Sequence, residues 1–552
     1  MSNPKSETMK KQLLLFLIWI FLVITTSMNA ENPKGTTSNI PYKSPGTVLY
    51  GTDLVINNDA SQDQLNVHVA VAFNGWLYAV YTHNTGSGGA GITILRSINN
   101  GINWTILMNY SYSGAFTATD IVAAGNNLTD LKLFVAGIYE VVSDDQRVWV
   151  DTYDAQTGAF INQFLFETNN NTLYDVAIAS DYRYPAVGSS PYSIGIVYAK
   201  FGSPLDSVVM LTSMDGGNTI GSRSAFACNN PYGGKVAISF GTSYTKNDGR
   251  YFIAWEEHEG GASVEGHIYT GHTDPFIYNP IGSKIELDSL DSYSLDNCRN
   301  PSIATQFNNI DNSSSNLTEI VLFDRYYTSN GDWDVIGYYN LTAANLGINS
   351  WQRLNIAVST DNELESDINF DPAFNNFLVT YYDAEAGNLP YIVNGMNLTS
   401  PNSWTVISPG YNDSPNLSDP YPKVEINPVV TKVANVWTQD GTGGGIAMFD
   451  AEYSNYVGIS QNHQSDQVNL KGAYPNPAKT MTSIDFTLTQ PAQVTITLYS
   501  LIGQEISVIS GGSYNQGEHK VTVDVSTLPE GTYLYSFKAG DFTTSGRITV
   551  LK

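Results

Sequence analysis

Short apolar runs that end in an aromatic residue recur along the chain at a nearly constant spacing. The first run is LYAVY, and a second apolar run that contains small residues precedes each copy. The step from one closing aromatic residue to the next is about 58 residues, with one longer step of about 68, and such a fixed period indicates an internal repeat of seven units. The closing residues are Tyr81, Tyr139, Tyr198, Trp255, Phe323, Tyr381 and Trp437.

Each unit is predicted to hold four strands joined by Gly- and Asn-rich turns, because no amphipathic helical stretch lies between the apolar runs. Strands that are apolar on both faces suit propeller blades, whereas separate sandwich domains need about 100 residues each. We therefore expect an all-β protein with a seven-bladed β-propeller over residues 46–459; six or eight blades are the alternatives. Residues 47–56 should add a strand to the last blade, and the seven aromatic residues should occupy equivalent positions on the second strands.

The composition supports this fold class and limits the partners. The 35 Tyr, 9 Trp and 47 Gly favour strands joined by tight turns. The 52 acidic against 26 basic residues give a net charge of −26, which repels phosphate backbones and anionic lipid. Nucleic-acid binding is therefore excluded.

The two cysteines allow one bridge but no four-thiolate zinc site. Cys228 and Cys298 each precede the inner strand of consecutive blades by a few residues, so we predict that they form a disulfide in an oxidising compartment. The alternative is two buried thiols that pack as small apolar groups.

Residues 1–30 have the pattern of a secretory signal peptide. Lys10 and Lys11 precede an apolar run over residues 13–24, and a small polar stretch follows. An uncleaved anchor is the alternative, but a membrane span needs about 20 apolar residues. We expect a linker over residues 31–45, no transmembrane segment in the mature chain, and export to the cell surface or the medium.

Two predicted hairpins carry a recognisable pattern of small and polar residues. One is SINNGINW, with Ser97, Asn99, Gly101 and Trp104, and the other is SMDGGNTI, with Ser213, Asp215 and Gly217. Both resemble the Asp box, or BNR repeat, of sialidase-like propellers. The resemblance implies a structural role away from the ligand face, in which the Asx side chain binds amides of its own turn.

The resemblance to sialidases does not extend to their chemistry. Those enzymes carry an arginine triad that begins near the domain start, but no arginine precedes Arg96 in this chain. The likeness is therefore to the scaffold, and a scaffold does not carry a function.

In a propeller the first strand of each blade lines the central channel. We predict a ligand site at the residue just before each of these inner strands, because the seven side chains should form a ring around one end of the channel. They are His68, Asp120, Asp175, Lys235, Ser302, Asp367 and Lys423, and Arg299 lies close in sequence. We take Asp120, Asp175, Arg299 and Asp367 as candidate ligand-binding residues. The alternative is that such groups cap strand ends and bond to each other or to water.

The sequence gives weaker signals for metal binding and for catalysis. Glu256, Glu257, His258, His267 and His272 share one blade, but no ligand spacing is recognisable, so we expect no metal and no cofactor. Asp324 followed by Arg325 suits either a glycosidase carboxylate or a local ion pair. No catalytic residue can be named.

The tail is a separate unit. After a polar linker at residues 460–472, residues 473–552 alternate apolar and polar positions as in a small antiparallel sandwich. Its sequence motifs, among them YPNP and LPEGTYLY, closely resemble those of the C-terminal sorting domain (type A) of type IX secretion substrates in Bacteroidetes-type bacteria. The resemblance implies a partner in the type IX machinery.

Two functions remain open. The first is a non-catalytic propeller, expected to be a monomer, that binds extracellular glycan or another polymer through Tyr and Trp platforms. The second is a glycoside hydrolase or lyase, which needs a pair of carboxylates about 5 to 9 Å apart. The first is favoured because no carboxylate pair stands out and the arginine triad is missing.

Overall fold

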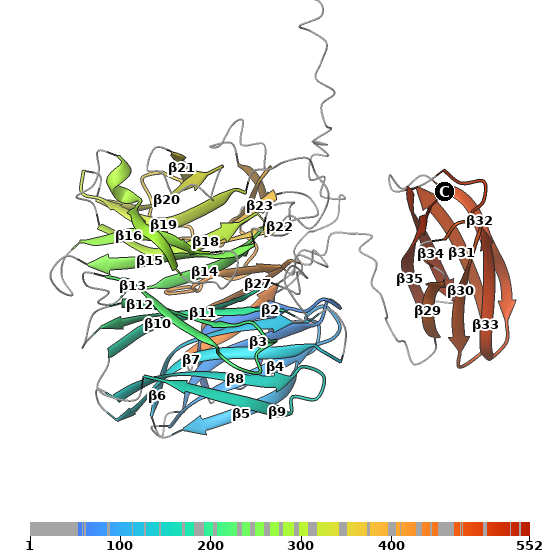
Figure 1. Cartoon of the computed structure of the whole chain (residues 1–552), viewed down its shortest axis with the longest axis horizontal. Helices are drawn as coiled ribbons and strands as arrows, with labels where there is room; N and C mark the ends of the chain where they lie inside the picture. Colours follow the sequence, from blue (N-terminus) through green and yellow to red (C-terminus); the bar gives the residue numbers. More distant parts are fainter. Residues whose placement is uncertain are drawn as a thin grey trace, which may run out of the picture. The chain divides into compact units, whose positions relative to one another are not determined.

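The computed structural model describes residues 53–450 and 468–551, with shorter gaps inside both ranges. Within the described part of the first range the strands form seven four-stranded antiparallel sheets. Each sheet's first strand contacts the first strand of the next sheet, and the last contacts the first again, so the sheets close into a ring (Figure 1). The predicted seven-bladed propeller is confirmed, and the longer step between Trp255 and Phe323 hides no further blade in the described residues.

The first strands lie around the axis of the ring. They are β2 (Gln62–Val71), β6 (Ala115–Ala124), β10 (Thr172–Ser180), β14 (Val236–Gly241), β18 (Asn297–Thr305), β22 (Glu363–Asp371) and β26 (Lys423–Ile426). The second strands are β3 (Leu77–Thr85), β7 (Lys132–Val142), β11 (Ile194–Phe201), β15 (Arg250–His258), β19 (Glu319–Tyr327), β23 (Asn376–Asp383) and β27 (Val433–Gly441).

The third and fourth strands follow outward. The third strands are β4 (Gly89–Ser97), β8 (Asp145–Asp154), β12 (Ser207–Ser213), β16 (Gly266–Thr273), β20 (Asp332–Asn340), β24 (Tyr391–Gly395) and β28 (Gly444–Asp450). The fourth are β5 (Thr105–Tyr112), β9 (Phe160–Phe166), β13 (Ser222–Ala227), β17 (Pro280–Glu286), β21 (Trp351–Ala357) and β25 (Thr405–Ser408), and a short 3₁₀ helix, Asp288–Leu290, follows β17.

The seventh blade takes its fourth strand from the other end of the propeller sequence. β1 (Leu54–Val55) pairs antiparallel with β28, with Leu54 opposite Phe449. The amide of Ile56 donates to the carbonyl of Ala447 at 2.9 Å, and the amide of Ala447 donates to Gln64 Oε1 at 3.0 Å. The predicted closure is therefore confirmed for residues 54–56, and residues 47–52 of the predicted segment lie outside the described residues.

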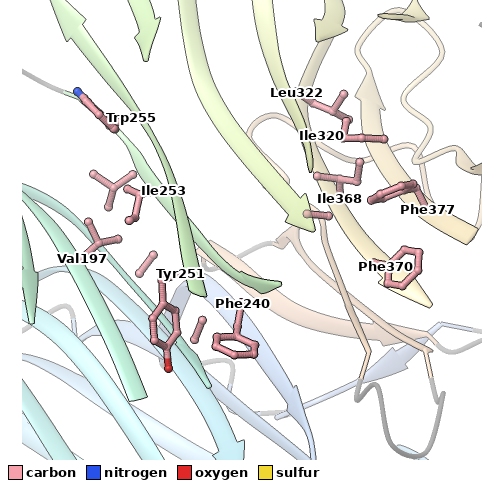
Figure 2. Close-up of a cluster of buried hydrophobic side chains, with 14 of the residues drawn as sticks. Val197, Phe240, Tyr251, Ile253, Trp255, Ile320, Leu322, Ile368, Phe370 and Phe377 are labelled. Atoms are coloured by element: carbon pink, nitrogen blue, oxygen red, sulfur yellow. The ribbon is translucent and has the colours of Figure 1, made fainter. Parts of the chain in front are cut away.

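Apolar clusters fill the spaces between neighbouring blades. In the largest, Val197 of β11 and Trp255 of β15 belong to the same cluster as Ile320 of β19 and Phe377 of β23 (Figure 2). Burying both faces of a sheet against its neighbours explains why these strands lack the polar alternation of a half-exposed sheet.

All seven repeat aromatics lie on second strands, but their predicted equivalent register is wrong. Tyr81, Phe323 and Tyr381 lie opposite a bulge in the first strand, whereas Tyr198 pairs with Val176 and Trp255 pairs with Val236. A bulge adds one residue to one strand, and the sequence period does not record where it falls.

The predicted disulfide is also wrong, because Cys228 and Cys298 are thiols. Cys228 follows β13, the outermost strand of blade 3, whereas Cys298 is fully buried on β18, the first strand of blade 5. The residues were expected on adjoining loops, but one lies at the rim of its blade and the other in a core cluster with Phe252 and Ile268. The alternative of two buried thiols that pack as apolar groups holds for Cys298, whereas Cys228 is only partly buried and packs against another apolar cluster.

The tail forms a sandwich of two antiparallel sheets. The three-stranded sheet has the order β29 (Val468–Tyr474), β30 (Met481–Leu488), β33 (Gly517–Asp524). The four-stranded sheet has the order β32 (Glu505–Tyr514), β31 (Ala492–Ser500), β34 (Gly531–Ala539), β35 (Phe542–Val550). β29 begins at Val468, so the sandwich extends into the segment expected as linker. The expected signal peptide and the linker at residues 31–45 lie outside the described residues.

Among the described residues, no helix has the length and apolar character that crossing a bilayer requires.

Candidate binding site at the channel entrance

The first strands of all seven blades line one central cavity of about 220 Å³. We call the end of the channel where these strands begin the channel entrance. The seven residues predicted to ring it all line the cavity: His68, Asp120, Asp175, Lys235, Ser302, Asp367 and Lys423. Arg299 lies at the same end of β18 but does not line the cavity.

Six of these seven residues form acid and base pairs between neighbouring blades. His68 Nδ1 lies 3.0 Å from Asp120 Oδ1. Lys235 Nζ lies 3.7 Å from Asp175 Oδ1, and Lys423 Nζ lies 3.5 Å from Asp367 Oδ1. A ring of seven has an odd member, which here is Ser302 of blade 5.

Each of the three aspartates also accepts a hydrogen bond from a backbone amide of the next blade. Asp120 Oδ2 accepts the amide of Ile178 at 2.9 Å. Asp175 Oδ2 accepts Val236 N at 3.1 Å, and Asp367 Oδ2 accepts Val424 N at 2.8 Å. These charge-assisted bonds leave the carboxylates with little remaining capacity for a ligand.

Blade 5 and its neighbour differ from the rest of the ring. The hydroxyl groups of Ser302 and Ser366 are buried and have no hydrogen-bond partner among the described residues. Both residues line the cavity. Buried polar groups normally find a partner, so two unsatisfied hydroxyls beside a cavity indicate a place where a bound group could supply one.

A second set of carboxylates binds left-handed backbone within or just before the first strands. Asn300, Glu365 and Tyr421 have left-handed backbone, with φ of 53°, 56° and 42°. Asp324 Oδ1 accepts the amide of Glu365 at 2.8 Å, and Glu365 Oε2 accepts the amide of Tyr421 at 2.8 Å. Glu256 Oε2 accepts the amide of Asn300 at 3.3 Å.

Burial alters the acidity of two of these carboxyl groups. It raises the pKa of Asp324 to about 6, against the opposing hydrogen bond from Asn300. It raises the pKa of Glu365 to about 8, and the nearby Asp324 adds to the effect. Glu365 lines the cavity, so it presents a largely neutral carboxyl group there at pH 7.

The sequence alone did not single out Glu365. Its one signal was an acidic residue two positions before Asp367, where the other blades have Asn66, Asn300 or Tyr421 with the same backbone conformation. Arg325, named beside Asp324, binds Asp291 through two bonds of 2.8 and 3.1 Å. It therefore belongs to a local ion pair and does not pair with Asp324.

Aromatic and basic side chains lie beside the entrance on blades 4, 5 and 7. The Arg299 guanidinium lies 4.0 Å from the centre of the Trp333 ring, and Trp333 packs on Tyr326 at 5.3 Å. Lys235 Nζ lies 5.9 Å from the centre of the exposed Tyr421 ring. We call Arg299, Tyr326 and Trp333 the blade-5 platform.

The two Asp-box-like hairpins lie elsewhere, and none of their residues lines the cavity. Ser213 Oγ accepts the amide of Gly217 at 2.9 Å, and Asp215 Oδ1 accepts the amide of Thr219 at 2.9 Å. The same bonds recur around Ser97 and Asn99 in blade 1, each at 2.9 to 3.0 Å. Trp104 packs edge-on against Phe449 of blade 7 at 5.4 Å.

The polar residues of blade 4 separate into groups. His258 Nε2 bonds Glu256 at 2.6 Å, and His272 Nδ1 bonds the carbonyl of Thr273. His267 lies near Glu286 and Asp288, with one candidate ligand atom from each within 4.8 Å of the others. Its Nδ1 lies 2.7 Å from Asp288, which an ordinary hydrogen bond accounts for.

Comparison with known families and structures identifies the tail. Residues 472–551 match the family described as the secretion system C-terminal sorting domain, which confirms the predicted type IX sorting domain. This tail marks the chain for export to the cell surface or the extracellular space. No curated protein matches the chain.

Several solved structures are similar to this chain at low identity. A Penicillium chrysogenum α-L-arabinanase complexed with arabinobiose is 12% identical, with coverage of 73% of this chain and 98% of that chain and a TM-score of 0.40. A Dyadobacter fermentans protein of unknown function is 9% identical over the same shares, with a TM-score of 0.41. An endo-arabinase from Bacteroides thetaiotaomicron is 10% identical, covering 64% and 100%, with a TM-score of 0.33.

Proposed function

We propose that this exported propeller binds an extracellular glycan or a similar polymer at the channel entrance, on the side of blades 5 to 7. The observation that carries the proposal is the odd position of blade 5. The other six ring residues pair with one another, whereas Ser302 and Ser366 have buried hydroxyls without a partner in the described residues. Ser302 lies on blade 5 with Arg299 and Trp333, and Ser366 lies on the neighbouring blade 6.

The chemistry of this side suits a sugar. A sugar ring has an apolar C–H face and a rim of hydroxyl groups, so it is bound by an aromatic surface together with a few fixed polar groups. The blade-5 platform supplies the aromatic surface. Ser302, Ser366 and Glu365, which line the cavity, are the nearby residues with polar side chains. The cavity volume of about 220 Å³ is below that of pockets for drug-sized ligands, so one sugar unit would enter at a time.

The test uses the purified full chain on a glycan array, followed by titration of any glycan that binds. Trp333→Ala should weaken binding roughly tenfold, which corresponds to about 1.4 kcal/mol. Tyr110→Ala is the matched control, because Tyr110 is an exposed aromatic residue on β5, the fourth strand of blade 1. Absence of binding to every glycan, or equal losses in the two variants, would contradict the proposal.

Glu365 favours a second candidate function, which is acid-assisted cleavage of the bound glycan. Its carboxyl lines the cavity on strained backbone, and burial raises its pKa to about 8, so it holds a proton at pH 7. A glycosidase needs such a proton for the leaving oxygen.

A hydrolysis screen separates the two functions. If the full chain hydrolyses a glycan, Glu365→Gln should abolish turnover while binding persists, because glutamine can still accept the Tyr421 amide. If no glycan that binds is hydrolysed, cleavage is rejected and binding stands.

A further inference from the structure

Four of the described strands of the sorting-domain sandwich are edge strands, and one of them has no basic residue. An edge strand presents a row of unpaired backbone N–H and C=O groups, and proteins commonly guard such edges with lysine, other charges or proline. The sequences of β29, β33 and β35 include a basic residue, namely Lys471, Lys520 and Arg547. β32 has ten residues and includes no basic residue and no proline; Glu505, at its first position, is its one charged residue.

The first half of β32 exposes two apolar side chains. The exposed fraction is 39% for Ile506 and 57% for Val508, and Ser507 between them is also exposed. The pairing of β31 with β32 shifts register twice beside this segment, and such irregularities bend a strand and increase its twist. Ile509, the next residue, packs partly against the sandwich core.

The second half of β32, Ser510 to Tyr514, has free space beside its backbone. Ser510 to Tyr514 pair regularly with β31, from Ile496 opposite Ser510 to Ala492 opposite Tyr514. Within this half, a Cβ added to Gly511 or Gly512 would meet no atom within 4 Å. The strand therefore offers room above its backbone as well as unpaired groups along its outer side.

We propose that β32 is the docking edge of the sorting domain, at which a β-strand of the secretion machinery adds to the four-stranded sheet beside β32. The occupant is assigned from the family match, because a secretion sorting domain must present a recognisable surface to the machinery that exports it. Strand addition supplies affinity through main-chain hydrogen bonds, and Ile506 and Val508 would contact apolar side chains of the added strand. The proposal is independent of the glycan proposal.

Export of the full chain in a bacterium with type IX secretion tests the proposal. A lysine on an exposed edge disfavours strand addition, so Val508→Lys should reduce the exported share at least fivefold and leave the chain in the periplasm. Met481→Lys is the matched control, because Met481 is 46% exposed and lies on β30, the central strand of the other sheet. Equal export of the two variants would overturn the proposal.

Two further measurements distinguish docking from misfolding and from self-association. The purified Val508→Lys chain should keep the melting temperature and protease resistance of the wild type. If it does not, the export experiment is repeated with Ser507→Lys. Normal export of a folded Ser507→Lys chain overturns the proposal. Sedimentation of the wild type gives the oligomeric state. A dimer that Val508→Lys converts to a monomer would assign the edge to a second copy of this chain and overturn the proposal.

Discussion

At the scale of single residues, many carboxylates of this propeller accept backbone amides of a neighbouring blade. Asp120, Asp175 and Asp367 do so at the ring, and Asp324 and Glu365 do so at left-handed backbone. Glu319 differs, because it is fully buried and its Oε1 accepts a hydrogen bond from the hydroxyl of Thr270 at 2.8 Å. Its Oε2 is buried without a partner in the described residues.

Glu319 should make the propeller less stable as pH rises. Burial raises its pKa from 4.5 to about 8, so the folded state holds the proton more tightly than the unfolded state. Its contribution is complete below about pH 4.5 and is lost as pH rises toward 8, by about 1.4 kcal/mol per pH unit for one group. Glu319→Gln stays neutral and should unfold with a free energy on the order of 2 kcal/mol larger at pH 8.

Thermal unfolding of the full chain between pH 5 and pH 9 measures this effect. Glu265→Gln is the control, because Glu265 is exposed and the substitution removes the same charge. A pH profile that is unchanged in Glu319→Gln would show that the buried carboxyl is not the titrating group.

At the scale of elements, the repeat was readable because its aromatic residues sit on second strands, where Trp255 and Trp437 are fully buried between blades. Bulges could not be predicted from the sequence, because their left-handed residues are as different as Asn66 and Glu365. The candidate binding site could likewise be predicted only in part. The position of Asp120 before an apolar run was visible in the sequence, but its bond to Ile178, 58 residues away, depends on the packing of blades.

The hairpin between β12 and β13 should depend on Gly217. This residue has φ of 76°, and an added Cβ would lie 2.0 Å from Cε1 of Phe134 in blade 2. An alanine there must adopt left-handed backbone and displace a buried ring, so Gly217→Ala should destabilise the protein by about 2 to 4 kcal/mol. Denaturant unfolding measures the loss.

Gly221 provides the matched control for this hairpin, because an added Cβ there would meet no atom within 4 Å. Gly221→Ala should leave the free energy of unfolding within about 0.5 kcal/mol of the wild type, as surface substitutions usually do. Equal stabilities for the two alanine variants would reject the account of the hairpin as a joint between blades 2 and 3.

At the scale of the whole propeller, stability depends on closing the ring, because every blade buries both faces against its neighbours. The closing joint lies between residues far apart in sequence: Leu54 pairs with Phe449, and the amides of Asp53 and Asp413 each donate to the other's carboxylate, at 2.9 and 2.7 Å. A propeller without this joint would have an unpaired strand at the edge of its last blade, and exposed edges of this kind promote aggregation.

Removing β1 should therefore destabilise the entire propeller and not only its last blade. A chain that starts at residue 57 loses the pairing with β28 and the bond from Ile56 to Ala447, so Phe449 and Met448 lose their cover on one side. We expect its melting temperature to fall by roughly 5 °C or more, since 1 to 2 kcal/mol shifts a large domain by several degrees. We also expect protease cleavage near β28 and concentration-dependent association through the uncovered edge.

A chain that starts at residue 50 keeps β1 and is the matched control, which should melt at the same temperature as the wild type. If the two truncated chains melt at the same temperature and resist protease equally, β1 is an accessory strand, and the ring is held closed by the packing of β2 against β26, β27 and β28.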